Sequence, residues 1–137
     1  FYRQFTRDLY RCRSEVIIEC PFITERRVSM LLPIFARLRR RGVQIIVNTR
    51  NPEDHDGGYY LQAIEAVSAM QDLGVKVLYT VGHHRKLAIL DQKIVYEGSL
   101  NILSFGDSCE IMRRIPSETA AKEVIRFTAL NRYVRSK

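Results

Sequence analysis

Short β-branched runs alternate with amphipathic segments over the first 80 residues, and this alternation limits the folds open to the chain. Residues 15–20, 43–48 and 75–79 are apolar runs too short for helices, which favours buried strands. Apolar residues at helical spacing fill the intervals between these runs and also precede them at residues 1–13. A helix that joins two strands of one sheet forms a right-handed crossover, so the strands run parallel. We therefore expect an α/β fold with helices on both faces of the sheet.

Capping residues and glycines predict where the helices begin and end. Thr24 can cap the second helix, which an arginine run followed by Gly42 can close. Pro33 lies inside this helix and therefore either kinks it or marks its true start. Gly74 closes the third helix, and Ser117 begins the last one.

The alternation of strands and helices breaks in the last third of the chain. Residues 86–90 and 93–97 are two apolar runs separated only by Asp91 and Gln92. Two residues cannot form a crossover helix, so these runs must pair as an antiparallel hairpin. Residues 109–115 are a further strand candidate. The predicted fold is therefore α/β, with a mixed, mostly parallel sheet and a C-terminal antiparallel hairpin.

The length of 137 residues suits a single domain with one hydrophobic core. The longest apolar stretches are too short to span a bilayer, so no membrane partner is expected. The chain starts at Phe1 without Met and without a charged-then-apolar signal segment. We infer a single domain over residues 1–137, cut from a longer chain in which other domains can be fused to it.

The three cysteines favour neither a disulfide framework nor a metal site. Cys12, Cys20 and Cys109 are widely spaced, form no C-x-x-C pair and have no histidine at zinc-finger spacing. We interpret them as buried free thiols, expect no metal and no cofactor, and take a reducing cytoplasm as the compartment.

The net charge of +7 is unevenly distributed and favours a polyanionic partner. Residues 1–50 carry 11 basic and 4 acidic groups, residues 51–110 carry 4 and 9, and residues 111–137 carry 7 and 2. Most of the basic groups are arginines, whose planar guanidinium matches phosphate oxygens. Solvated helix faces are the alternative explanation. The candidates for nucleic-acid contacts are Arg39, Arg40, Arg41 and Arg85.

Two short polar segments carry the candidate chemistry. On a strand, His84 and Lys86 would project from the same face, because they are two residues apart. One hairpin later, Gly98 lets the backbone approach a ligand, while Ser99 and Asn101 supply short neutral donors. An imidazole can attack phosphorus, and the other groups can neutralise charge on phosphate oxygens without a metal ion.

Each of these residues alone has an ordinary structural explanation, such as a core histidine, a solvated lysine or a turn. The ordered set is more specific: His84-x-Lys86, four residues to Asp91, and then Gly98-Ser99-x-Asn101 after six more. Its residue types and gaps resemble the HKD motif of the phospholipase D superfamily. The order of helices and strands around the motif is also similar, so the resemblance covers most of the chain.

The resemblance implies a role for each residue of the motif. His84 would be the nucleophile that forms a phosphohistidine, and Lys86 and Asn101 would hold the phosphate oxygens. Ser99 would assist at the same pocket. Glu110 lies where members of the family often carry an acid that can orient the imidazole, although the loop before it varies in length.

Three further polar residues near the motif or in loops need separate interpretations. Asp91 belongs to the motif, but strand alternation places it off the face of His84, so we interpret it as a turn or supporting residue. His83 should face away from His84 for the same reason. His55 lies in a polar loop and is more typical of a surface residue than of a ligand.

The resemblance determines the chemistry better than the substrate. The short chain, single motif and arginine-rich ends are most like the small bacterial endonucleases of the superfamily, so we expect a nuclease that cleaves DNA. One alternative is a phospholipid phosphodiesterase, which would need an apolar interfacial surface that no segment here suggests. Another is a catalytically silent nucleic-acid-binding domain, which the complete motif disfavours.

A single motif supplies a single reactive histidine, whereas the reaction needs two. One imidazole must attack phosphorus, and another must protonate the leaving oxygen. A twofold homodimer would bring His84 of each chain into one shared pocket, as the resemblance implies for single-motif members. The alternative is a second, divergent half elsewhere in the parent protein.

Overall fold

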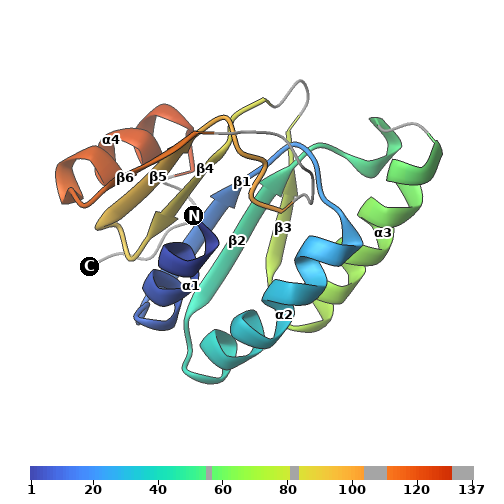
Figure 1. Cartoon of the computed structure of the whole chain (residues 1–137), viewed down its shortest axis with the longest axis horizontal. Helices are drawn as coiled ribbons and strands as arrows, with labels where there is room; N and C mark the ends of the chain where they lie inside the picture. The colour runs from blue at the N-terminus through green and yellow to red at the C-terminus, as the bar shows by residue number, and fades with distance from the viewer. Residues whose placement is uncertain (55–56, 81–83, 104–110, 131–137) are drawn as a thin grey trace.

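The computed structural model describes residues 1–54, 57–80, 84–103 and 111–130, which form one open sheet flanked by helices (Figure 1). The sheet order is β3-β2-β1-β4-β5-β6. The strands are β1 (Glu15–Glu19), β2 (Gln44–Thr49), β3 (Lys76–Tyr79), β4 (Leu87–Leu90), β5 (Ile94–Gly98) and β6 (Met112–Ile115). The helices are α1 (Tyr2–Tyr10), α2 (Glu25–Arg40), the 3₁₀ turn η1 (Pro52–Asp54), α3 (Gly57–Asp72) and α4 (Glu118–Phe127). None of these helices is long and apolar enough to cross a membrane.

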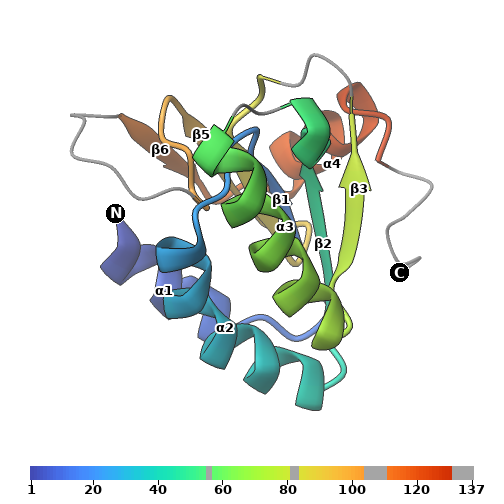
Figure 2. The ribbon, with the colours of Figure 1, turned by 90° about the vertical axis from the view of Figure 1, so that its right-hand side faces the viewer.

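Helices cover both faces of the sheet, which confirms that part of the prediction. Alternation along β1 directs Val16 and Ile18 into one cluster with Phe5 of α1 and Phe35 of α2. Ile17 points the other way and packs with Ile125 of α4. Figure 2 shows α1, α2 and α3 on one side of the sheet and α4 on the other.

The sheet is mixed as predicted, but its antiparallel part is larger than the description "mostly parallel" implies. Of the pairings between described strands, β1 with β2 and β2 with β3 are parallel. The pairings of β1 with β4, β4 with β5 and β5 with β6 are antiparallel. The difference arises because the chain returns to the free edge of β1 after β3, and the three residues between β4 and β5 are too few for a parallel crossover.

The helix ends follow the capping signals of the sequence. The hydroxyl of Thr24 accepts a hydrogen bond from the backbone N–H of Arg27 at 3.4 Å, and Ser117 caps α4 in the same way. Gly42 follows α2 with φ +82, a conformation that glycine adopts without strain. Pro33 lies inside α2 and does not mark its start, because the helix already begins at Glu25. Two of the three cysteines, Cys12 and Cys20, are free and buried as expected, and Cys109 lies outside the described residues.

Candidate active site

The motif residues gather at the end of the sheet where β1, β2, β3 and β5 finish. This edge is a switch point: the chain leaves β1 towards β2 on one side, and β4 pairs with β1 on the other. Open α/β sheets bind ligands at such points, outside the carboxyl ends of the strands. The register Leu87↔Glu97 places the segment before β4 beside the segment after β5. Both halves of the motif therefore reach the same edge.

His84 and Lys86 lie just before β4 and not on the strand, so that detail of the prediction is wrong. The strand begins at Leu87, whose partner Glu19 is the last residue of β1. Because β1 ends at this pair, the residues before Leu87 have no β1 strand to pair with. Lys86 keeps one link to the sheet, because its carbonyl accepts the N–H of Gly98 at 3.3 Å.

Lys86 and Ser99 line one open pocket of about 560 Å³. The other residues of its wall are Arg85, Leu87, Glu97, Gly98, Ile111 and Arg113. Arg113 is ion-paired with Glu97, whereas the Lys86 ammonium has no carboxylate partner among the described residues. It donates instead to the carbonyl of His84 at 3.2 Å. Lys86 is thus the cation of this pocket that remains available to an anionic group.

Asn101 lies beside the buried thiol of Cys20, the residue that follows β1. The Sγ of Cys20 lies 3.9 Å from Oδ1 of Asn101. Burial raises the pKa of Cys20 to about 11, and the nearby positive charge of Lys86 is one of the influences that oppose the rise. Cys20 is therefore protonated at neutral pH and lies close to Asn101. Sequence reasoning treated this cysteine only as a buried thiol.

Gly98 and Ser99 hold the start of β6. The Ser99 hydroxyl accepts the N–H of Ile111 at 3.1 Å, and the N–H of Ser99 donates to the Ile111 carbonyl at 2.9 Å. A Cβ on Gly98 would lie 2.0 Å from that carbonyl oxygen. Glycine is thus required here by the close approach of the protein's own backbone, whereas the sequence had suggested an approach to a ligand.

The His84 side chain is exposed at the rim of the site. Within the described segments its imidazole makes no hydrogen bond or ion pair. Glu110, which the resemblance assigns to orienting it, lies outside the described residues, as do His83 and His55. No group of three or more potential metal ligands occurs in the part of the chain that the structure describes.

Arg85, predicted to contact nucleic acid, is bound to a buried carboxylate. Its Nε and Nη2 donate to the two carboxylate oxygens of Glu19, each at 2.9 Å, and Glu19 is fully buried. Asn48 donates to the same carboxylate at 2.8 Å and accepts the Thr80 hydroxyl at 2.8 Å. A buried charge needs such partners to offset its desolvation. Because Arg85 lies between His84 and Lys86 in the sequence, this network anchors the segment that carries both.

The network was missed because Glu19 was interpreted simply as part of an apolar strand. The signal was present, since a carboxylate within a buried run must find a donor. Which donor it finds depends on contacts between residues that are 66 positions apart.

Asp91 lies at the opposite end of β4 and does not line the Lys86 pocket. With Gln92 it forms the β4–β5 turn, and both residues have positive φ, 53° and 55°. Its carboxylate accepts backbone N–H groups of Arg13, Ser14 and Glu15 at 2.9, 2.8 and 3.0 Å. Its position supports the interpretation as a turn and supporting residue and not its inclusion among the catalytic residues.

Arg39, Arg40 and Arg41 lie at the end of the sheet away from the Lys86 pocket, and they differ in their partners. Arg39 donates to the carbonyl of Val43 at 2.9 Å. Arg41 donates to the carbonyl of Tyr10 at 2.8 Å. Of the three, Arg40 alone makes no hydrogen bond or ion pair with the residues that the structure describes.

A mixed open sheet with this motif at its switch point defines a phospholipase D-like domain. The family model described as "Cardiolipin synthase, PLD-like domain" matches residues 5–130, and the chain belongs to this family. No curated protein matches the chain in sequence.

Solved structures share the fold at low sequence identity. Nuc from Salmonella typhimurium, described as a phospholipase D family member, matches with TM-score 0.73 and 14% identity, covering 92% of this chain and 82% of its own. NucT from Helicobacter pylori matches with TM-score 0.67 and 18% identity, covering 92% and 83%. TrmBL2, an archaeal chromatin protein described as binding DNA, matches with TM-score 0.62 and 10% identity over 98% of this chain and half of its own.

Proposed function

We propose that this domain is a phosphodiesterase half-site that cleaves DNA through a phosphohistidine. The observation that carries the proposal is that Lys86 and Ser99 line one pocket at the carboxyl edge of the sheet, close in the chain to the exposed His84 and to Asn101. Lys86 and Asn101 would hold the non-bridging phosphate oxygens, whose charge grows in the transition state.

The reaction proceeds by two displacements at phosphorus. A ring nitrogen of His84 forms a bond to phosphorus while the bond to the leaving oxygen breaks, and a second imidazole donates a proton to that oxygen. Water then attacks the phosphohistidine, the second imidazole takes its proton, and the free His84 is restored. Imidazole groups supply the nucleophile and carry every proton in both steps, so the reaction balances without a metal ion.

The second imidazole would come from a twin chain in a homodimer with one shared pocket. Light scattering should then find the active species at twice the mass of 16.0 kDa. Mixed dimers of wild type and His84→Asn should have almost no turnover, because every shared pocket would lack one of its two imidazoles. Full activity at the mass of one chain would contradict the shared site.

Two observations support nucleic acid as the substrate. The chain carries a net charge of +7, and one of its structural neighbours is described as a DNA-binding chromatin protein. The description of the matched family favours a second candidate, a phospholipid phosphodiesterase. That substrate would need a broad apolar surface around the pocket, whereas the wall combines Leu87 and the exposed Ile111 with the charged side chains of Lys86, Glu97 and Arg113.

The test is cleavage of single-stranded DNA, duplex DNA, RNA and phospholipid vesicles in excess EDTA. We expect DNA to be cleaved and a phosphohistidine to be trapped by alkaline quenching. His84→Ala should abolish both signals, and His83→Ala should retain most of the activity, because the motif assigns the attacking imidazole to His84 and not to its neighbour. Loss of cleavage in EDTA, or equal losses in the two variants, would contradict the mechanism. Cleavage of vesicles alone would instead support the phospholipid candidate.

A further inference from the structure

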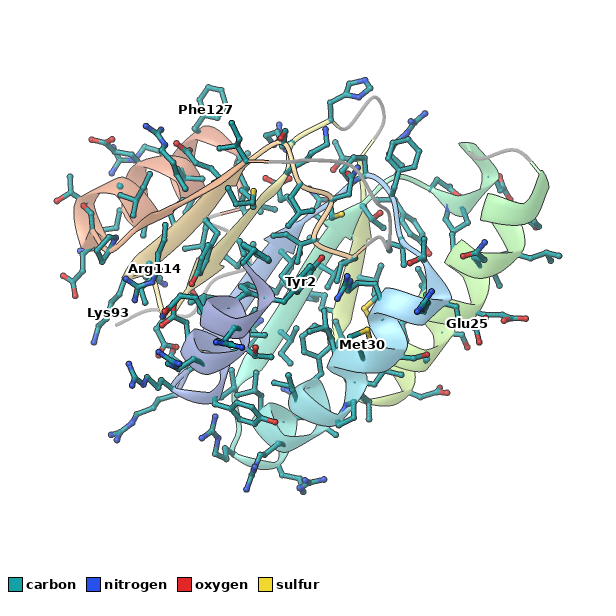
Figure 3. All side chains as sticks on the ribbon, viewed as in Figure 1. Tyr2, Glu25, Met30, Lys93, Arg114 and Phe127 are labelled. Atoms are coloured by element: carbon teal, nitrogen blue, oxygen red, sulfur yellow. The ribbon has the colours of Figure 1, made fainter. Side chains whose placement is uncertain are left out.

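Two hollows adjoin on the side of the sheet that α1 covers, and together they lead away from the motif. The first, of about 440 Å³, reaches Leu100, which lies between Ser99 and Asn101 in the sequence. The second, of about 340 Å³, reaches Lys93 in the β4–β5 turn. Arg114 lines both hollows, and Figure 3 shows it next to Lys93. The two hollows meet at Arg114 and together reach from the motif loop to the far end of β4; we refer to them as the groove.

The far half of this groove has an excess of available positive charge. Arg11, Arg13 and Lys93 line it, are exposed, and have no carboxylate partner among the residues described here. The two acids of the same wall are already bound. Asp8 accepts from Arg114 at 2.7 Å, and Asp91 accepts three backbone N–H groups. An anion in the groove would therefore meet cations that nothing else neutralises.

The near half of the groove contains a supported aromatic ring. Phe1 is 40% exposed and stacks on Phe5, with ring centroids 5.1 Å apart and planes inclined by 21°. It also makes an edge contact with Tyr96 at 5.4 Å. A ring held from two sides while partly exposed can offer a surface to a planar group, at a small cost in side-chain entropy.

We propose that this groove binds the single-stranded segment of nucleic acid that adjoins the cleaved phosphodiester, with a base stacked on Phe1 and phosphates at Arg11, Arg13 and Lys93. The inference rests on the proposed function. It favours a single strand, because aromatic rings stack on bases that are exposed and duplex DNA hides them. The groove spans about 20 Å, since six residues, mostly those of the extended strand β5, separate Lys93 from Leu100. A segment of several nucleotides would be held, without preference for sequence.

The test measures binding of a fluorescent 20-nucleotide oligo(dT) to the full chain in the His84→Ala background, in which the probe stays intact. Arg11→Gln with Lys93→Gln removes one arginine and one lysine from the groove. Arg126→Gln with Lys122→Gln is the matched control, because it removes the same residue types from exposed positions on α4, across the sheet. Phe1→Leu removes the aromatic ring, and Phe1→Tyr retains it.

We expect the groove pair to weaken binding and to reduce the salt slope by about 1.4, since each phosphate contact on a single strand contributes about 0.7. The control pair should leave both quantities close to their starting values. Phe1→Leu should weaken binding about tenfold, Phe1→Tyr should preserve it, and duplex DNA of equal length should bind less tightly than oligo(dT).

Equal effects of the two pairs would mean that only net charge matters, and this would overturn the groove. Tighter binding of duplex DNA than of oligo(dT) would also overturn it. The same holds if Arg11→Gln with Lys93→Gln weakens binding to phosphatidylglycerol vesicles but not to oligo(dT). Failure of the proposed function is distinguishable from these outcomes. A chain that binds through the groove but cleaves nothing contradicts the function alone, whereas a nuclease whose binding ignores the groove substitutions contradicts the groove alone.

Discussion

The two ends of the central sheet each contain a bound carboxylate, but they use it differently. At the carboxyl end, Glu19 binds the side chain of Arg85, which lies between the exposed His84 and the pocket residue Lys86 in the chain. At the other end, Asp91 accepts hydrogen bonds from three backbone N–H groups and so joins the β4–β5 turn to the start of β1. One carboxylate anchors a segment that carries reactive groups, while the other stabilises a turn. The eight positions from His84 to Asp91 therefore contain candidate reactive residues at one end and a residue that stabilises the fold at the other.

The largest expected effect is that of Asp91→Ala on stability. It would leave three backbone N–H groups without their charged acceptor and place alanine at positive φ, so the free energy of unfolding should fall by about 3 kcal/mol in urea denaturation. Asp91→Asn is the control. It keeps one acceptor oxygen and tolerates positive φ, so its loss should be about 1 kcal/mol. Equal losses would show that the turn does not depend on the carboxylate.

Gly98 and Gly42, which lie at opposite ends of the sheet, extend the comparison. Gly98→Ala should cost about 2 kcal/mol, because its Cβ would overlap the carbonyl of Ile111, which cannot move without displacing β6. Gly42→Ala should cost about 1 kcal/mol, because nothing lies within 4 Å and only its positive φ opposes alanine. Chemical denaturation of the two variants measures both values. A smaller loss for Gly98→Ala would indicate that β6 can shift.

Local signals predicted most of the fold and the residues of the motif, but not the partners of the buried charges. Thr24 and Ser117 cap helices where their side chains and the following pattern suggested. The hairpin followed from the two-residue gap alone. In contrast, the bond between Glu19 and Arg85 arises only when β1 and β4 become neighbours. The carbonyl contacts of Arg39 and Arg41 at the end of α2 were not predicted for the same reason, because local sequence does not show which guanidinium finds a carbonyl.

A smaller effect on stability, with a clear effect on catalysis, is expected for Glu19→Gln. The neutral amide cannot accept both guanidinium donors, and Arg85 is 37% exposed and can be partly solvated, so the loss should be about 1.5 kcal/mol. Under the proposed function, kcat should fall about tenfold with little change in KM, because His84 and Lys86 lose their anchor while binding groups elsewhere remain. Gly42→Ala, at comparable stability, should keep its kcat. Equal kcat losses would assign Glu19 a purely structural role.

The smallest effect concerns Asp8, another bound carboxylate near the far end of the sheet. Burial by itself would raise the pKa of Asp8, but hydrogen bonds from Arg114 and Tyr96 outweigh it and lower the pKa below its ordinary value. A carboxyl whose pKa is lower in the folded state stabilises the fold fully above its unfolded pKa of about 4, and this contribution is lost as pH falls through the lowered value. Asp8→Asn should therefore reduce the free energy of unfolding by about 1 kcal/mol at pH 7, and the difference from wild type should shrink steadily as pH falls below 4. Thermal unfolding of both chains between pH 2.5 and pH 7 measures that convergence. Parallel curves over the whole range would mean that Arg114 does not favour the charged form of Asp8, and the far end would then be stabilised by Asp91 without help from this second carboxylate.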